Sequence, residues 1–274
     1  MELDALLALP FSLPSIPKVV ALLLSELSGD DPDLRRVTQL VRTDPALTAR
    51  LLQIANSGFF QLSGTINSAS EALAVLSLSH MRAMAAAAAG STSPKSVVGI
   101  NLPQFWSYSL NVAKVSRSLA GVVRQNQQAA FTAGLIHAVG ELAMHLGMPD
   151  EMAEINRDSD SLDQSRARVE MRTFNYGYAQ VGAGYARKWL YPQPIVDALE
   201  QQYAPFKNEA YEPLAGVIHL ASWRARAKEA GLSQRELAVS FPGAVGEVLA
   251  LDIDMVLQQD PIDWASQAPG KPLL

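Results

Sequence analysis

The sequence predicts an all-α protein built from two packed helical lobes. Apolar residues recur at helical spacing along almost the whole chain, and prolines stand just before these segments. No segment alternates convincingly between apolar and polar residues. The nearest, KSVVGINLP, is too short to build a sheet. We therefore expect about a dozen helices and no sheet.

The first clear helix is predicted to begin at Pro45. Asp44 precedes it and can cap the helix, while proline is tolerated at the first helical position because its missing N–H would have no partner there. Leu47, Leu51 and Ile54 then follow at the spacing of one helical face. This segment is expected to be an amphipathic helix with one buried side.

The same periodicity predicts the later elements. Helices are expected over residues 69–76, 103–124, 181–189, 195–199 and 214–223. The irregular stretch GSTSPKSVVG (90–99) separates the lobes. We assign 1–98 to an N-terminal helical lobe, 99–260 to a core with C-terminal helices, and 261–274 to a frayed tail.

Composition excludes several classes of protein. Apolar residues make up 49% and charged residues 18%, which is typical of a globular chain. The net charge of −5 gives no overall attraction to nucleic acid or to anionic lipid. The absence of cysteine excludes disulfides, a thiol nucleophile and Cys-ligated metals. With neither a signal peptide nor a run of about 18 apolar residues, we expect a soluble, cytoplasmic protein.

Few residues in the sequence are candidates for catalysis or metal binding. The stretch GLIHAVGELAMHL places His137, Glu141 and His145 four residues apart on one expected helix. The two histidines lie roughly 12 Å apart along the axis, too far to share one ion. Glu141 and His145 are expected to face solvent or to cap neighbouring groups. We expect His80 to be a cap or surface residue and His219 a hydrogen-bonded, semi-buried one.

Other catalytic templates find no match. The sequence has no GxxxxGK[ST] loop, no GxGxxG after a strand and no GxSxG elbow. GAGYA (182–186) lies within a helical pattern, where its small residues permit close helix packing. The tract WRARAKEAG (223–231) is expected to be a solvated basic face rather than a phosphate-binding patch.

Several motifs in order resemble a known family. LPSIPKVVALLLSEL, VTQLVRTDPALTARLLQIANSGFF and INSASEALAVLSLSHMR are followed by FWSYSLNVAKVSRSLA and AAFTAGLIHAVGELAM. They resemble the HDOD domain, the HD-related output domain of bacterial signalling proteins, over roughly residues 9–225. The most specific marks are Asp44-Pro45 with Leu47, and Asn56-Ser57. The resemblance implies an N-terminal helical lobe on a core related to the HD metal-dependent phosphohydrolases.

The resemblance also implies that a metal centre has been lost. The HD enzymes hold their metal with histidines and aspartates. By position, these ligands correspond here to Tyr108, the pair His137-Ala138, Tyr178, the pair Gln202-Tyr203, and Ser222. Only His137 survives. A neutral imidazole without a carboxylate cannot hold a hydrolytic metal, so we expect neither a metal nor another cofactor.

Three functions follow from this resemblance. The first is a non-catalytic module of bacterial signal transduction, such as a two-component pathway, acting through contacts with signalling proteins that the sequence does not name. The alternative is a sensor that binds a nucleotide or metabolite in the vestigial cavity. The third is a residual metal-dependent phosphohydrolase. The cavity is expected to be lined by Trp106, Tyr108, His137, Glu141, Tyr178 and Tyr203.

Overall fold

The structure, a computed structural model, describes residues 1–10, 12–60, 62–90, 94–206 and 211–258. Within these ranges it is helical and has no strand beyond one isolated bridge between Val97 and Ile100. The prediction of an all-α protein is confirmed. The tail assigned to 261–274 lies outside the described residues.

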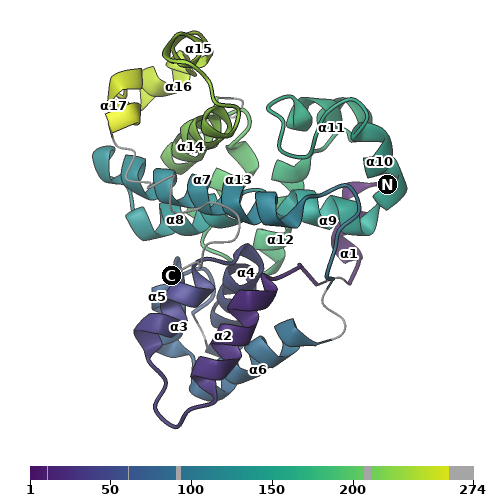
Figure 1. Cartoon of the computed structure of the whole chain (residues 1–274), viewed down its shortest axis with the longest axis vertical. Helices are drawn as coiled ribbons and strands as arrows, with labels where there is room; N and C mark the ends of the chain where they lie inside the picture. Colours follow the sequence, from purple (N-terminus) through teal and green to yellow (C-terminus); the bar gives the residue numbers. More distant parts are fainter. Residues whose placement is uncertain (11, 61, 91–93, 207–210, 259–274) are drawn as a thin grey trace.

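The N-terminal lobe forms the lower part of Figure 1 and is built from five α-helices and one 3-10 turn. Its core is a cluster of leucine, valine, alanine and methionine side chains from all five helices. The elements are α2 (Pro17–Leu27), α3 (Leu34–Val41), α4 (Pro45–Ala55), η1 (Gly58–Phe60), α5 (Ala69–Val75) and α6 (Leu78–Ala89).

The core lobe is arranged around the long α7, which runs across the middle of Figure 1 beside α8. Its first half contains α7 (Leu102–Val122), α8 (Gln127–Ile136), α9 (Val139–Gly147), α10 (Pro149–Ile155) and α11 (Arg166–Phe174). Its second half contains α12 (Tyr178–Lys188), α13 (Gln193–Gln201), α14 (Pro213–Glu229), α15 (Gln234–Ser240), α16 (Gly243–Val248) and α17 (Ile253–Gln258). Each segment predicted from periodicity is helical, with shifted ends.

The first helix departs from the assignment of 1–98 to one lobe. Helix α1 (Leu3–Ala8) packs on the core lobe, where Leu6 is completely buried beside Met144 and Tyr185. The Tyr185 hydroxyl donates a hydrogen bond to the Leu6 carbonyl at 2.9 Å. The chain therefore begins on the core and then crosses to the N-terminal lobe.

Helix α4 joins the two lobes because it buries both of its sides. Leu47 and Leu51 lie in the N-terminal core, while Ala49 and Leu52 belong to the large cluster of the core lobe. The Tyr191 hydroxyl donates to the Ala49 carbonyl across this junction at 2.6 Å. The sequence pattern predicted only one buried side for α4.

Asp44 fixes the start of α4. It is completely buried, and its carboxylate accepts hydrogen bonds from the Leu47 N–H at 2.9 Å and the Ile16 N–H at 2.6 Å. Burial raises the pKa of Asp44 to about 6, which the backbone donors oppose. The expected cap is thus confirmed, and the same side chain also anchors the residue before α2.

One stretch, Gln127–Gly147, is long and apolar enough to cross a membrane by length and composition. In the fold it is divided between α8 and α9, and 94% of its most apolar window is buried within the protein. Its apolarity is therefore explained by its place at the centre of the core lobe.

Asn56 ends α4 and joins it to a distant turn. The side chain is fully buried; its Nδ2 donates to the carbonyls of Leu52 at 3.1 Å and Ile66 at 3.0 Å. Its Oδ1 accepts from the Ile66 N–H at 3.1 Å. The partners of Asn56 are thus Leu52, one turn earlier, and Ile66, ten positions further on. Ser57, the second motif residue, donates to the Ile54 carbonyl at 2.7 Å.

We predict that Asn56→Ala lowers the free energy of unfolding by about 1–3 kcal/mol, because it leaves buried backbone groups of Ile66 and Leu52 without partners. Asn67→Ala is the matched control, since Asn67 makes an exposed side-chain bond to the Thr65 carbonyl. Urea unfolding of the three proteins measures the difference. Equal losses in the two variants would remove the structural role assigned to Asn56.

Candidate functional site

The cavity predicted around His137 lies where α7, the α8–α9 junction, α12 and α14 meet. Tyr108 comes from α7, His137 from the junction and Tyr178 from the first turn of α12. Together with Glu141 and Arg226 they line a cavity of about 10 Å³. This volume is close to the minimum that holds one water molecule. Four of the six predicted cavity residues are thus brought together.

The remaining two lie elsewhere. Tyr203 is on the surface, with 36% of its area exposed. Trp106 packs at the boundary between the N-terminal core and a small cluster around Leu142. The structure does not place either residue at the cavity, which is closed instead by Ser161, Leu162 and Asp163.

His137 interrupts the helix that the sequence predicted to be continuous. Helix α8 ends at Ile136 and α9 begins at Val139. The Glu141 N–H bonds to the Ala138 carbonyl at 3.0 Å, and the freed His137 carbonyl accepts from Gln202 Nε2 at 2.9 Å. Gly140 is required here because any side chain would collide with the Tyr178 carbonyl. His137 therefore does not share a helix with Glu141 and His145.

The His137 ring is neutral. It is 1% exposed, and burial lowers its pKa to about 3. Its Nδ1 lies 2.7 Å from the Gly134 carbonyl, so Nδ1 carries the proton and donates it. Nε2 then carries a lone pair, and it has no hydrogen-bond partner among the described residues.

The neighbouring aromatic groups are neutral as well. Burial raises the pKa of both Tyr108 and Tyr178, an effect that the Arg226 cation partly opposes. The Tyr108 ring lies 5.3 Å from the His137 ring and 5.8 Å from the Arg226 guanidinium carbon. The Ser222 hydroxyl also opposes the rise in the pKa of Tyr108. The Tyr108 and Ser222 hydroxyls nevertheless do not form a hydrogen bond with each other.

These groups do not fit a metal. Ala138 offers no ligand atom, and the Gln202 amide nitrogen is engaged by the His137 and Leu199 carbonyls. Within the described ranges, no cluster of three or more His, Cys, Asp or Glu side chains could hold an ion. The carboxylates of Glu141 and Asp163 also line the cavity, but Glu141 is paired with the Arg166 cation at 2.8 Å, and Arg226 adds a second positive charge that opposes a metal ion.

Glu141 and His145 correct the sequence prediction most sharply. They were expected to face solvent or to cap neighbouring groups, but they are 1% and 2% exposed and belong to a buried network. Both contact Arg166, whose side chain is completely buried: its Nη2 lies 2.8 Å from Glu141 Oε1 and 3.2 Å from His145 Nε2. The solvent that the prediction assumed is replaced by a guanidinium from α11.

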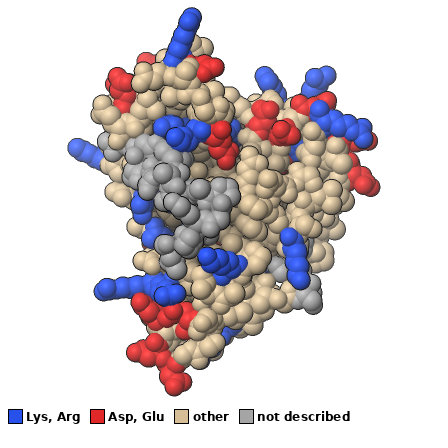
Figure 2. Space-filling view, in the orientation of Figure 1, with Lys and Arg blue, Asp and Glu red and all other residues tan. Residues whose placement is uncertain are grey.

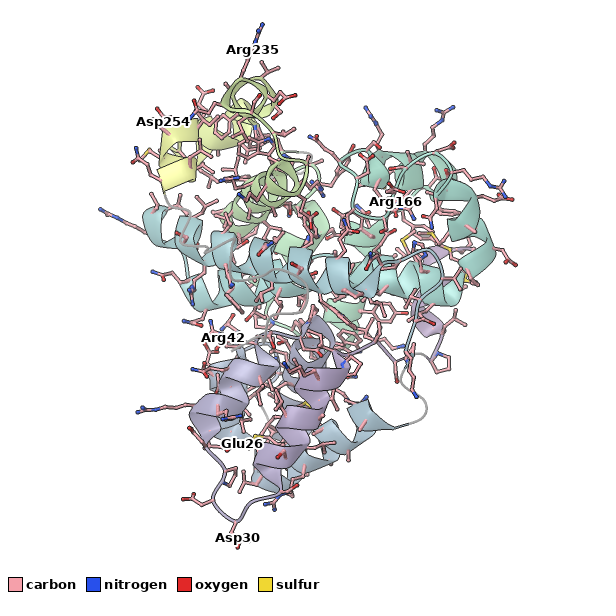
Figure 3. The ribbon with its side chains drawn as sticks, in the orientation of Figure 1. Glu26, Asp30, Arg42, Arg166, Arg235 and Asp254 are labelled. Carbon is pink, nitrogen blue, oxygen red and sulfur yellow. The ribbon has the colours of Figure 1, made fainter. Side chains whose placement is uncertain are left out.

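Arg166 is the centre of a buried network (Figure 3). Its Nε donates to Glu170 Oε1 at 2.9 Å, and its Nη1 donates to Asn156 Oδ1 and the Ser159 carbonyl at 2.8 and 2.7 Å. Glu170 Oε2 accepts the Tyr178 N–H at 2.8 Å. The network therefore links α9, α10 and α11 to the start of α12.

Sequence reasoning missed Arg166 and Glu170. The two residues stand four apart on a helix that is poor in apolar residues, a pattern typical of a solvated helix face. In the structure this charged side is the buried one, together with Ala167. The only local sign of this ion pair in the sequence was that Arg166 and Glu170 stand four residues apart.

The network holds two carboxyl groups and one arginine. Burial raises the pKa of Glu141 and of Glu170, and the negative charge of Glu141 raises that of Glu170 further. His145 is neutral because burial lowers its pKa to about 4, while its Nδ1 donates to the Val98 carbonyl at 2.8 Å. Sharing of one proton between the two glutamates would leave the whole network without net charge.

A larger cleft lies outside this cavity. It has a volume of about 650 Å³ and shares Ser161, Leu162, Asp163 and Arg226 with the inner cavity. The Arg226 Nε donates to the Leu162 carbonyl at 3.0 Å, so these residues form a wall between the two spaces. In Figure 2 the outline dips between the α14–α17 end and the α10–α11 end.

We predict that Arg166→Met lowers the free energy of unfolding by about 3–5 kcal/mol, because it removes the cation that balances the buried carboxyl pair. Arg168→Met on the exposed side of the same helix is the control and should change stability little. Chemical unfolding of both variants checks this. Similar losses would show that the buried network is dispensable.

The shared proton gives a prediction for pH. Because the folded pKa of the glutamate pair is raised, its stabilising contribution is present at low pH and is lost as pH rises through that pKa. Glu170→Gln removes one of the two ionising carboxyls, so its stability should decline less as pH rises. Unfolding free energies measured across the pH range test this, and parallel declines would contradict proton sharing.

Comparison with known proteins places this geometry in a family. No protein with a curated description matches the chain. The response regulator MmoQ from Methylococcus capsulatus str. Bath is similar in two structures. One is 24% identical with a TM-score of 0.74, covering 93% of this chain and 100% of that chain. The other is 25% identical with a TM-score of 0.72, covering 90% and 95%.

A candidate phosphohydrolase from Shewanella amazonensis SB2B is 25% identical with a TM-score of 0.53, covering 90% of this chain and 89% of that one. The model of the HDOD domain matches residues 13–205, which include the Asp44-Pro45 and Asn56-Ser57 motifs and the residues that line the His137 cavity except Arg226. The protein belongs to the HDOD family.

Proposed function

We propose that this HDOD protein is a non-catalytic module of bacterial signal transduction that acts through contacts with other proteins. A signalling role fits the family and the similarity to a response regulator. The observation that carries the non-catalytic part is the small, ligand-poor cavity around His137. Its volume of about 10 Å³ admits no phosphate ester, and its lining residues do not fit a metal.

The N-terminal lobe offers a surface for such contacts. Phe59 in η1 is 80% exposed, and its ring packs edge-on against Phe60 at 5.0 Å between centroids. His80 lies 5.3 Å from the Phe60 ring and completes this aromatic cluster. A rigid, exposed aromatic residue is a typical anchor in a protein interface. We assign partner binding to this aromatic cluster of Phe59, Phe60 and His80.

The first test concerns metal. Purified protein is expected to hold less than stoichiometric metal and to hydrolyse neither phosphodiesters nor phosphomonoesters with added Mn²⁺, Mg²⁺ or Fe²⁺. Elemental analysis and hydrolysis assays measure both. An equimolar transition metal that is lost in His137→Ala, with hydrolysis lost in the same variant, would establish the residual phosphohydrolase instead.

The second test concerns the surface. Phe59→Asp is expected to abolish capture of protein partners from a lysate of the source organism without lowering the melting temperature. Val239→Asp is the matched control, because Val239 is 82% exposed on α15 in the core lobe. His137→Gln should also leave partner capture intact. Loss of capture in His137→Gln, in a protein that melts normally, would move the functional site to the cavity.

The alternative of a small-molecule sensor is supported by a different space from the one predicted. The inner cavity is too small for a nucleotide or metabolite, but the outer cleft of about 650 Å³ lies within the range of ligand sites. Its wall, Leu162 and Arg226, also borders the His137 cavity. A rise in melting temperature with a small molecule, lost in Arg226→Gln, would favour this function.

A further inference from the structure

Two arginines share one aromatic ring at the junction of the lobes. Arg42 follows α3 in the N-terminal lobe, whereas Arg117 lies on α7 and Phe131 on α8. The guanidinium carbon of Arg42 is 4.3 Å from the centre of the Phe131 ring, and that of Arg117 is 5.7 Å from it. Figure 3 shows Arg42 between the N-terminal helices and α8. Two cations, one from each lobe, therefore lie close to the Phe131 ring.

These two charges are not balanced within the described part of the chain. Neither arginine forms an ion pair with any carboxylate there. Arg42 Nη2 is buried and has no hydrogen-bond partner among the same residues. Burial lowers the pKa of Arg42, and the charge of Arg117 lowers it further. Such a group is costly unless a further anion or hydrogen-bond acceptor reaches it.

The surroundings extend this positive charge. In Figure 2, lysine and arginine side chains gather along the left edge of the molecule at the level of the lobe junction. The protein as a whole has a net charge of −5, so this edge opposes the overall sign. A local excess of cations on an acidic protein attracts an anion to that place.

We propose that Arg42 and Arg117 bind a dianionic phosphate group at the lobe junction. Guanidinium groups present paired N–H donors that match phosphate oxygens, and the ring of Phe131 lies within cation–π distance of both groups. A phosphate monoester carries a charge of about −1.5 to −2 at neutral pH, which balances two arginines where a carboxylate would balance one.

The phosphate can come from a free phosphorylated metabolite or from a phosphorylated side chain of another protein, because both present the same group. Binding would connect the lobes, since each lobe contributes one arginine. The site shares no residue with the His137 cavity or with the aromatic cluster around Phe59. The inference therefore does not depend on the proposed function.

The experiment compares melting temperatures in phosphate and in chloride at equal ionic strength. Arg117→Gln is the test variant, and Arg172→Gln, an exposed arginine on α11, is the control with the same change in charge. Phosphate should raise the melting temperature of the wild type and of the control but not of Arg117→Gln. Calorimetric titration with phenyl phosphate should show affinity weakened roughly tenfold or more in Arg117→Gln only.

A second variant covers the possibility that replacing Arg42 unfolds the lobe. Arg42→Lys keeps the charge but loses the fork of donors, so it should remain folded and bind phenyl phosphate more weakly than the wild type. Without phosphate, Arg117→Gln should melt no lower than the wild type, because it relieves the repulsion from Arg42. A lower melting temperature would assign Arg117 a structural role and overturn the proposal.

The two sources of phosphate are separated by a last titration. A phosphoserine peptide that binds more tightly than phenyl phosphate, and only when Arg117 is present, would identify a protein source. Equal affinities for the two probes would identify recognition of the phosphate alone, as for a small metabolite. A phosphate effect of the same size in the wild type and in Arg117→Gln would show that no such site exists.

Discussion

The core lobe depends on a guanidinium that has no contact with solvent. Arg166 is 0% exposed, and an unpaired charge at that depth would cost several kcal/mol, so each of its donors must find an acceptor. The acceptors are Glu141 on α9, Glu170 on α11, Asn156 after α10 and the Ser159 carbonyl. These elements can reach their final positions only together, because the charge is satisfied only when they all surround it.

Glu141 connects this network to the vestigial cavity. One of its carboxyl oxygens pairs with Arg166, and the residue also lines the space beside His137. In a metal enzyme, an ion would hold the surrounding helices together at this place. Here a cation that belongs to the chain joins α9, α11 and the first residue of α12. The helices of this region are therefore joined by a charge that the chain itself supplies.

The sequence predicted those structural features that depend only on residues close together in the chain. Asp44 and Pro45 mark the start of α4 because a cap and a missing N–H act within one turn. The break at His137 could not be predicted, since its carbonyl is taken by Gln202, sixty-five positions away. The network around Arg166 was hidden for a related reason. Charged residues on a polar helix indicate exposure unless a distant partner, here Glu141, covers them.

The cavity and the lobe junction differ in what they can respond to. His137 is neutral with a pKa of about 3, so it does not change its charge near neutral pH, and its cavity is closed. The junction contains α4, whose two sides are packed into both cores, and a pair of cations that repel each other. Close-packed cores shift as rigid bodies and do not deform continuously. A molecule bound at the junction would therefore act on the relative position of whole lobes.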